Sequence, residues 1–237
     1  MITIVLSVFA VLIMLSTFYF RRPIYALSLK LIFGEFHEKY MSLFFHGANY
    51  ESNYLKEELS SQIVNMKNAL NSRKKIKAQK PIYFQDIEYG ISTRKLISRL
   101  GKPYSSDLLD LGDIKVVVLE YHIKPNNVID KYNYYFYKDR YYSGEFLFNK
   151  VGTDTSEQII DSIQSKYGVK NTNNDYFVLN DKKRNLLAFN DHGYSVSVSY
   201  FNGENPDIVD LIACQNRREK ETKSLYDVNI NIQELSF

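Results

Sequence analysis

The sequence predicts an α+β protein: an N-terminal transmembrane helix and a helical stalk, then two tandem units of one helix and a three-stranded antiparallel sheet. Three observations predict this fold. The chain opens with an uncharged apolar run, apolar residues then recur at helical spacing, and the order helix, strand, strand, strand occurs twice. The expected boundaries are an anchor over 1–22, a stalk over 23–80, a first unit over 81–150, a second unit over 151–205, and a C-terminal helix and tail over 206–237.

The anchor is predicted from residues 1–20, which contain no charged side chain. A helix of that length covers the roughly 30 Å hydrocarbon core of a bilayer. A cleaved signal peptide would need a basic start and small residues at its end, but this run ends in the bulky Phe18, Tyr19 and Phe20. A lipoprotein signal would need a cysteine just after the run, and the single cysteine is Cys214. The sequence therefore predicts an uncleaved single-pass anchor.

The charges beside the predicted anchor set its expected orientation. Arg21, Arg22 and Lys30 follow the apolar run, and only the terminal amine precedes it. Because positive charges stay on the cytoplasmic side, the sequence predicts a cytoplasmic body. A periplasmic or extracellular body is the alternative.

The stalk is expected to contain two helices with a break near residues 46–49. The second helix carries one apolar stripe at steps of three and four residues. The stripe consists of Leu55, Leu59, Ile63, Met66 and Leu70. Two interpretations remain open: the stripe packs on the chain's own globular domain, or it joins two copies as a short coiled coil.

A basic run over residues 73–80 is expected to end this helix, and Pro81 prevents its continuation. Lys and Arg are favourable at a helix C-terminus, where they interact with the free carbonyl groups. The alternative is a patch that contacts anionic headgroups or nucleic acid.

The first unit is expected to begin with a short helix after Ser92 or Thr93, either of which can cap its free N–H groups. Gly101 supplies the left-handed position at its end, and Pro103 prevents continuation. Three strands should follow. They are expected over 115–123, 131–137 and 141–148, with a tight turn over 138–140.

The second unit repeats this order. Its helix is expected over 155–167, capped by Thr155 or Ser156 and ended by Gly168. Its three strands are expected over 175–179, 185–189 and 194–201, and the last alternates serine with tyrosine and valine. A final helix is expected from Pro206 through Cys214 to about residue 223.

The stretch Gly90-Ile91-Ser92, Leu96 and Leu100-Gly101-Lys102-Pro103, followed by antiparallel strands, resembles the small outer-membrane-assembly lipoprotein family. The duplicated order resembles the β-lactamase inhibitory protein architecture. The resemblance covers about sixty residues, mainly 90–149, and the second unit lacks the Leu-Gly-x-Pro motif. It implies a protein that binds other proteins and is not an enzyme. It also implies a periplasmic body, whereas the charges beside the anchor predict a cytoplasmic one.

The sequence provides no catalytic, cofactor or metal assignment. A single cysteine excludes an intramolecular disulfide and any cysteine-cluster metal site, and Cys214 is expected to be a buried thiol. His37, His46, His122 and His192 form no metalloprotease motif, and no phosphate loop or nucleophile elbow occurs. The net charge of +3 is too small to indicate a nucleic-acid partner.

A tyrosine-rich strand over 132–137, continued at residues 141 and 142, is the one unusual surface candidate. Because side chains alternate along a strand, aromatic rings must lie on both faces of the sheet. One interpretation is cross-strand pairing that steadies the sheet. The other is an exposed protein-binding face, where tyrosine is enriched. The candidate binding residues are Tyr135, Tyr137, Tyr141 and Tyr142.

These observations together predict a membrane-tethered, non-enzymatic protein-interaction module, with another protein as its partner. The alternative is a membrane-associated, hydrolase-like enzyme whose site the sequence does not display. A deep polar pocket with a perturbed carboxylate or histidine would favour the enzyme.

Overall fold

The computed structural model describes residues 21–43, 51–110, 114–122, 131–149, 151–170, 172, 175–218 and 220. Within these residues the protein is α+β, as predicted, and its centre is one eight-stranded mixed sheet. The strands are β1 (Lys75–Lys77), β2 (Ser105–Asp110), β3 (Lys115–Tyr121), β4 (Lys131–Tyr137), β5 (Arg140–Asn149), β6 (Tyr176–Asn180), β7 (Asn185–Asp191) and β8 (Ser195–Asn202). Their spatial order is β1-β6-β7-β8-β5-β4-β3-β2, and only β1 and β6 run parallel.

The prediction of two separate three-stranded units is wrong. The six expected strands form as β3 to β5 and β6 to β8, but β5 pairs with β8 from Ser143 opposite Phe201 to Asn149 opposite Ser195. This pairing removes two exposed strand edges, which separate units would have left open to other chains. Two further strands, β1 and β2, extend the sheet at its two ends.

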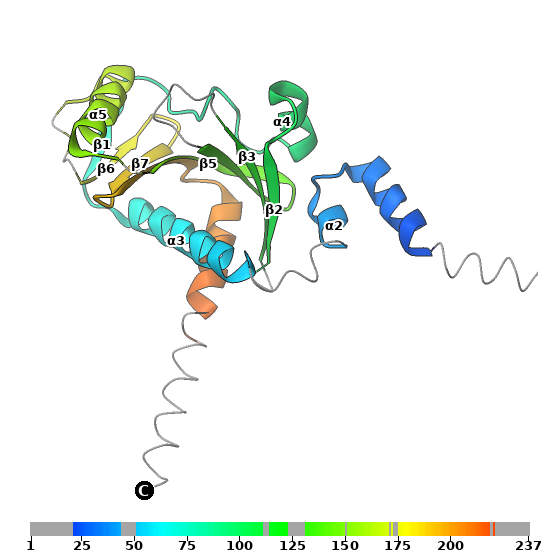
Figure 1. The fold of residues 1–237 in the computed structure, drawn as a ribbon. Coiled ribbons are helices and arrows are strands. Elements are labelled where there is room, and N and C mark those ends of the chain that lie inside the picture. The colour runs from blue at the N-terminus through cyan, green and yellow to red at the C-terminus, as the bar shows by residue number, and fades with distance from the viewer. Residues whose placement is uncertain are drawn as a thin grey trace, which may run out of the picture.

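Helices cover both faces of this sheet (Figure 1). The labelled helices are α2 (Glu38–Met41), α3 (Glu51–Asn71), α4 (Thr93–Leu100) and α5 (Thr153–Tyr167). Residues 21–33 and 206–218 are also helical. Figure 1 shows α5 on one side of the sheet and α3 with the helix at 206–218 on the other, so we name the two sides the α5 face and the α3 face.

Alternation along each strand divides its side chains between these faces. In β4, Tyr134 and Phe136 pack on the α5 face, whereas Tyr135 and Tyr137 pack on the α3 face, as the alternation predicted. The sheet is therefore the middle layer of three, with a hydrophobic core on each side.

The predicted ends of the short helix α4 are confirmed. The Ser92 hydroxyl accepts a hydrogen bond from the Lys95 backbone N–H, and Gly101 adopts a φ of 85° at the end of the helix. The predicted N-terminal caps of α5, Thr155 and Ser156, are wrong, because the helix begins at Thr153 and the residue before it, Gly152, provides no side-chain cap. Ser156 instead donates its hydroxyl hydrogen bond to Asp191 at the end of β7. The predicted end of α5 at Gly168 is confirmed, since this glycine adopts a left-handed φ of 66°.

The end of α3 also differs from the prediction. The helix stops at Asn71, and part of the basic run forms β1, which pairs with β6. The Lys75 ammonium group donates to the Leu70 carbonyl at 2.6 Å. This contact agrees with a role for the basic run at the helix C-terminus, where free carbonyl groups attract cations.

The predicted single-pass anchor is not supported. Residues 1–20, on which that prediction rested, lie outside the described residues. Among the helices that the structure does describe, none is both long and apolar enough to cross a bilayer. The long helix α3, for example, contains Glu51, Lys56 and Glu57. We therefore correct the prediction of a single-pass membrane protein, together with the cytoplasmic or periplasmic placement that depended on it.

Candidate functional site

A polar cavity of about 390 Å³ lies between α3 and the α3 face of the sheet. A volume of this size is sufficient for a small molecule. Its lining residues are Ser61, Gln62, Asn65, Lys131, Glu145, Leu147, Asn149, His192, Ser195, Val196 and Ser197. Most of them carry hydroxyl, amide or charged groups, whereas the rest of this face is mainly apolar.

The polar side chains reach the cavity because they occupy matching positions on neighbouring strands. The backbone register places Asn133 of β4 opposite Glu145 of β5, and Glu145 opposite Ser199 of β8. Two residues before Asn133, Lys131 at the start of β4 begins a second row that contains Leu147 and Ser197. Since alternate residues share a face, both rows lie on the α3 side of the sheet.

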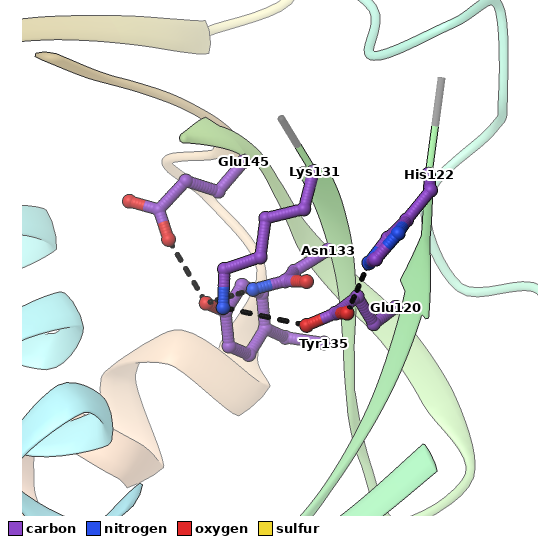
Figure 2. Close-up of polar contacts among 6 residues, drawn as sticks. All are labelled: Glu120, His122, Lys131, Asn133, Tyr135 and Glu145. Atoms are coloured by element: carbon purple, nitrogen blue, oxygen red, sulfur yellow. Dashed lines mark hydrogen bonds and ion pairs between the residues drawn. The ribbon is translucent and has the colours of Figure 1, made fainter. Parts of the chain in front are cut away.

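Glu145 is the central charged group of this arrangement, and its residue is only 4% exposed. One carboxylate oxygen accepts a hydrogen bond from the Tyr135 hydroxyl at 2.9 Å, and the other accepts one from the Ser199 hydroxyl at 2.9 Å. Removing a carboxylate from water is costly unless hydrogen bonds replace its hydration. The two hydroxyl groups provide that replacement and fix the carboxylate in place. Figure 2 shows the contact with Tyr135.

Asn133 lies beside Glu145 and is 2% exposed. Its amide nitrogen donates to the Tyr135 hydroxyl at 3.4 Å, as Figure 2 shows. Its amide oxygen is buried and has no hydrogen-bond partner within the protein. An acceptor without a partner is costly to bury.

A second set of polar contacts lies near the end of β3 (Figure 2). The Lys131 ammonium group lies 3.3 Å from one oxygen of Glu120, and the His122 ring nitrogen Nε2 lies 2.5 Å from the other. His122 stacks on the exposed ring of Tyr104, with ring centroids 3.9 Å apart. Glu120 therefore holds Lys131 at the rim of the cavity.

Gln62 joins α3 to the sheet beneath the cavity. Its side-chain nitrogen donates to the Ser143 hydroxyl at 3.4 Å, and its oxygen accepts from the Tyr142 hydroxyl at 3.3 Å. Burial raises the pKa of Tyr142 well above its ordinary value, and the negative charge of nearby Glu145 raises it further. The phenol thus stays protonated and available as a donor. These bonds fix the position of α3, which places Ser61 and Asn65 on the cavity wall.

The predicted protein-binding tyrosines are buried. Tyr135, Tyr137 and Tyr142 lie in the core of the α3 face, and Tyr141 lies in the core of the α5 face. Each is at most 7% exposed. The sequence correctly placed aromatic rings on both faces, but α3 and the helix at 206–218 cover the second face. Tyr135 is the member of this group whose hydroxyl contacts Glu145.

The apolar stripe on α3 packs on the chain's own sheet. Leu59, Ile63 and Met66 are fully buried in the core of the α3 face, and Leu70 packs against it. The side chain of Leu55 lies outside the described residues. The interpretation of the stripe as an internal packing surface therefore agrees with the structure.

The remaining sequence candidates lie apart from the cavity, with one exception. His192 lines it, whereas His37 is buried and accepts a hydrogen bond from the Lys39 backbone N–H in α2. His46 lies outside the described residues. Cys214 packs against the core of the α3 face. No cluster of three or more histidine, cysteine or acidic side chains that could hold a metal ion occurs in the part of the chain described.

The opposite face contains a cavity of different character. It has a volume of about 320 Å³ and lies between α5 and strands β5 and β8. Its walls are mostly aromatic and aliphatic, with Phe146, Phe148, Ile159 and Ile163 among them, and Lys166 at the side of α5. The structure thus has a polar cavity on the α3 face and a largely apolar one on the α5 face.

Sequence reasoning missed Lys131 and Glu145, which line the polar cavity, and Asn133, which lies opposite Glu145 in the sheet. The available signal was the placement of polar residues at every second position of three predicted strands, including Ser195, Ser197 and Ser199 in β8. The strand register needed to bring these rows together cannot be obtained from one sequence.

Comparisons of this chain with protein-family models, curated proteins and solved structures find no match. The resemblance to outer-membrane-assembly lipoproteins and to the β-lactamase inhibitory protein stays a prediction. The geometry of the polar cavity is accordingly the basis for proposing a function.

Proposed function

We propose that the protein is a non-enzymatic binding module whose ligand is a small polar molecule held between α3 and the sheet. The observation that carries this proposal is the buried carboxylate of Glu145 on the wall of a polar cavity, with one hydroxyl donor on each oxygen. A buried charge contributes little to the stability of a fold, because its desolvation cost offsets the interactions that it gains. A binding role accounts for it better.

The cavity contains both hydrogen-bond donors and hydrogen-bond acceptors. Lys131 and the serine hydroxyls can donate, while Glu145 and the amide oxygens of Gln62 and Asn65 can accept. These groups fit a molecule of about the size of a monosaccharide, an amino acid or a nucleoside with several hydrogen-bonding groups. A small ligand also fits better than a protein surface, because the tyrosines expected to meet a protein are buried.

The hydrogen bonds that Glu145 accepts from the protein favour a binding role over catalysis. Both of its oxygens already accept hydrogen bonds from the protein. These contacts hold the carboxylate in one position, as a group that binds and orients a ligand requires.

A hydrolase-like enzyme is the second candidate, and one observation favours it. Glu145, Lys131 and His192 line the same cavity, and all three are residue types that act in acid–base catalysis. Consumption of the bound compound, lost on Glu145→Gln, would show this function instead.

A ligand screen with a matched variant tests the binding proposal. Amino acids, monosaccharides, nucleosides and polyamines would be screened by thermal shift, and hits confirmed by calorimetry. We expect Glu145→Gln to weaken binding about ten- to hundredfold, as the loss of a hydrogen bond to a charged group does. Glu157→Gln, on the exposed side of α5, is the control and should bind normally. Equal affinity of wild type and Glu145→Gln would contradict the proposal.

A further inference from the structure

The polar cavity on the α3 face has one charged group of each sign on its walls. Among the described residues that line it, Glu145 is the only carboxylate and Lys131 the only ammonium group, and the other polar side chains carry hydroxyl, amide or imidazole groups. A ligand without charge would cover both groups without providing an opposite charge, and the desolvation of unmatched charges is costly. The cavity therefore favours a ligand that itself carries one charge of each sign.

The strand register places the two charged residues at diagonal positions of neighbouring strands. Lys131 of β4 lies opposite Leu147 of β5, and Glu145 precedes Leu147 by two residues on the same strand. Diagonal neighbours of this kind lie about 7–8 Å apart in an antiparallel pair. Charge-assisted hydrogen bonds are about 2.7–2.9 Å long. A compound whose ammonium and carboxylate groups share one carbon atom can therefore contact both side chains.

Both charged groups are held in position by the protein and keep the capacity for further hydrogen bonds. The hydroxyls of Tyr135 and Ser199 each donate to one oxygen of Glu145, and a carboxylate has about four acceptor sites. Glu120 holds the Lys131 ammonium group at 3.3 Å, and an ammonium group has three donors. Glu120 is not among the residues that line the cavity, so Lys131 is the member of this pair that a ligand meets.

Resting on the binding function above, we propose that the ligand of the polar cavity is a free α-amino acid with an uncharged polar side chain. Its ammonium group donates to Glu145, and its carboxylate accepts from Lys131. Its side chain meets walls of hydroxyl and amide groups, among them Ser61, Asn65 and Asn149. The cavity volume of about 390 Å³ suits a compound of this size.

The first test removes one charge at a time from the ligand and uses the wild-type protein, so it does not depend on the folding of a variant. L-Glutamine, L-asparagine and L-serine would each be compared by calorimetry with an analogue without the carboxylate and an analogue without the ammonium group. For glutamine these analogues are γ-aminobutyramide and glutaramate. We expect binding of at least one amino acid and about ten- to hundredfold weaker binding of both its analogues, because each lacks a charge-assisted hydrogen bond. An analogue that binds as tightly as its amino acid would overturn the proposal.

The second test removes the charges of the protein. In Glu145→Gln, the amino acid and its analogue without the ammonium group should bind equally, because the ammonium group has lost its partner. In Lys131→Gln, the amino acid and its analogue without the carboxylate should bind equally for the corresponding reason. Lys166→Gln, at the cavity on the α5 face, is the matched control and should leave all affinities unchanged. A variant at Glu145 or Lys131 that weakens the amino acid and both analogues by the same factor would contradict these contacts.

Two outcomes separate the ligand class from the binding function on which it rests. Binding of a neutral compound such as D-glucose or uridine, lost in Glu145→Gln and without binding of any amino acid, would overturn the ligand class and leave the binding function standing. Absence of binding by every compound in the screen would overturn both.

Discussion

Gly144 and Glu145 are neighbours in β5, yet they contribute to opposite faces of the sheet with opposite chemistry. On the α5 face, the missing side chain of Gly144 makes room for Phe84, whose ring lies 5.0 Å from Tyr134 and 5.2 Å from Tyr200. On the α3 face, Glu145 holds a charge beside a polar cavity. One strand thus supports a closely packed aromatic core and a polar site at once.

The two faces of the sheet contribute differently to stability and to function. Dispersion and burial of rings stabilise the α5 face, where polar groups are mainly phenol hydroxyls. The α3 face combines a hydrophobic region under α3 with rows of polar residues that reduce its apolar contacts. Polar groups that lower stability and gather in one region are typical of a functional site.

Replacement of Ile63 by alanine tests whether the apolar part of the α3 face is also core. Ile63 is completely buried under α3, so its truncation should lower the free energy of unfolding by about 2–4 kcal/mol. Urea unfolding measures the change. Asn68→Ala, on the exposed side of α3, is the control. Loss of a dimer in sedimentation, with no loss of stability, would instead support the stripe as a self-association surface.

Gly144→Ala tests the close packing on the α5 face. The added Cβ would overlap the ring of Phe84, and overpacking of this kind lowers stability by about 1–3 kcal/mol. Thermal unfolding measures the effect. Gly152→Ala is the matched control, because nothing lies within 4 Å of a Cβ there. Equal melting temperatures of Gly144→Ala and Gly152→Ala would show that the α5 face is loosely packed.

Alkaline pH should weaken the α5 face gradually. Burial raises the pKa of Tyr121 and of Tyr167 from 10.0 to about 12. Their stabilising contribution is complete below pH 10, where the unfolded chain is still protonated, and is lost as the pH rises through about 12. The free energy of unfolding should therefore fall over this interval, together with the rise of tyrosinate absorbance. Full tyrosinate absorbance in a folded protein near pH 10 would contradict this expectation.

The sequence predicts the positions of the individual strands better than the order in which the strands pair in the sheet. Strands β3 to β8 were expected near their observed positions because their alternation and turns are local signals. The pairing of β5 with β8 joins residues that lie 46 positions apart at Asn149 and Ser195 and 58 apart at Ser143 and Phe201, so no local pattern predicts it. The short β1 was expected as the end of a helix, since its three residues contain two lysines.

The candidate site was less predictable than the strands. The tyrosine-rich strand predicts an exposed aromatic face because one helix per unit can cover only one face of the sheet, whereas α3 also packs over the other face. Glu145, by contrast, follows Gly144 in a mostly hydrophobic strand and resembles an ordinary surface carboxylate in the sequence. Its importance depends on the hydroxyls of Tyr135 and Ser199, which only the folded sheet brings to it.

The most direct test of the central claim is a map of backbone amide chemical shifts during titration with a compound found in the ligand screen. We predict that the shifts concentrate on the α3 face, at Ser61, Asn65, Glu145 and Ser197, and that Glu145→Gln greatly reduces them. Shifts concentrated on the α5 face, around Phe148 and Ile159, would contradict the assignment of the binding site.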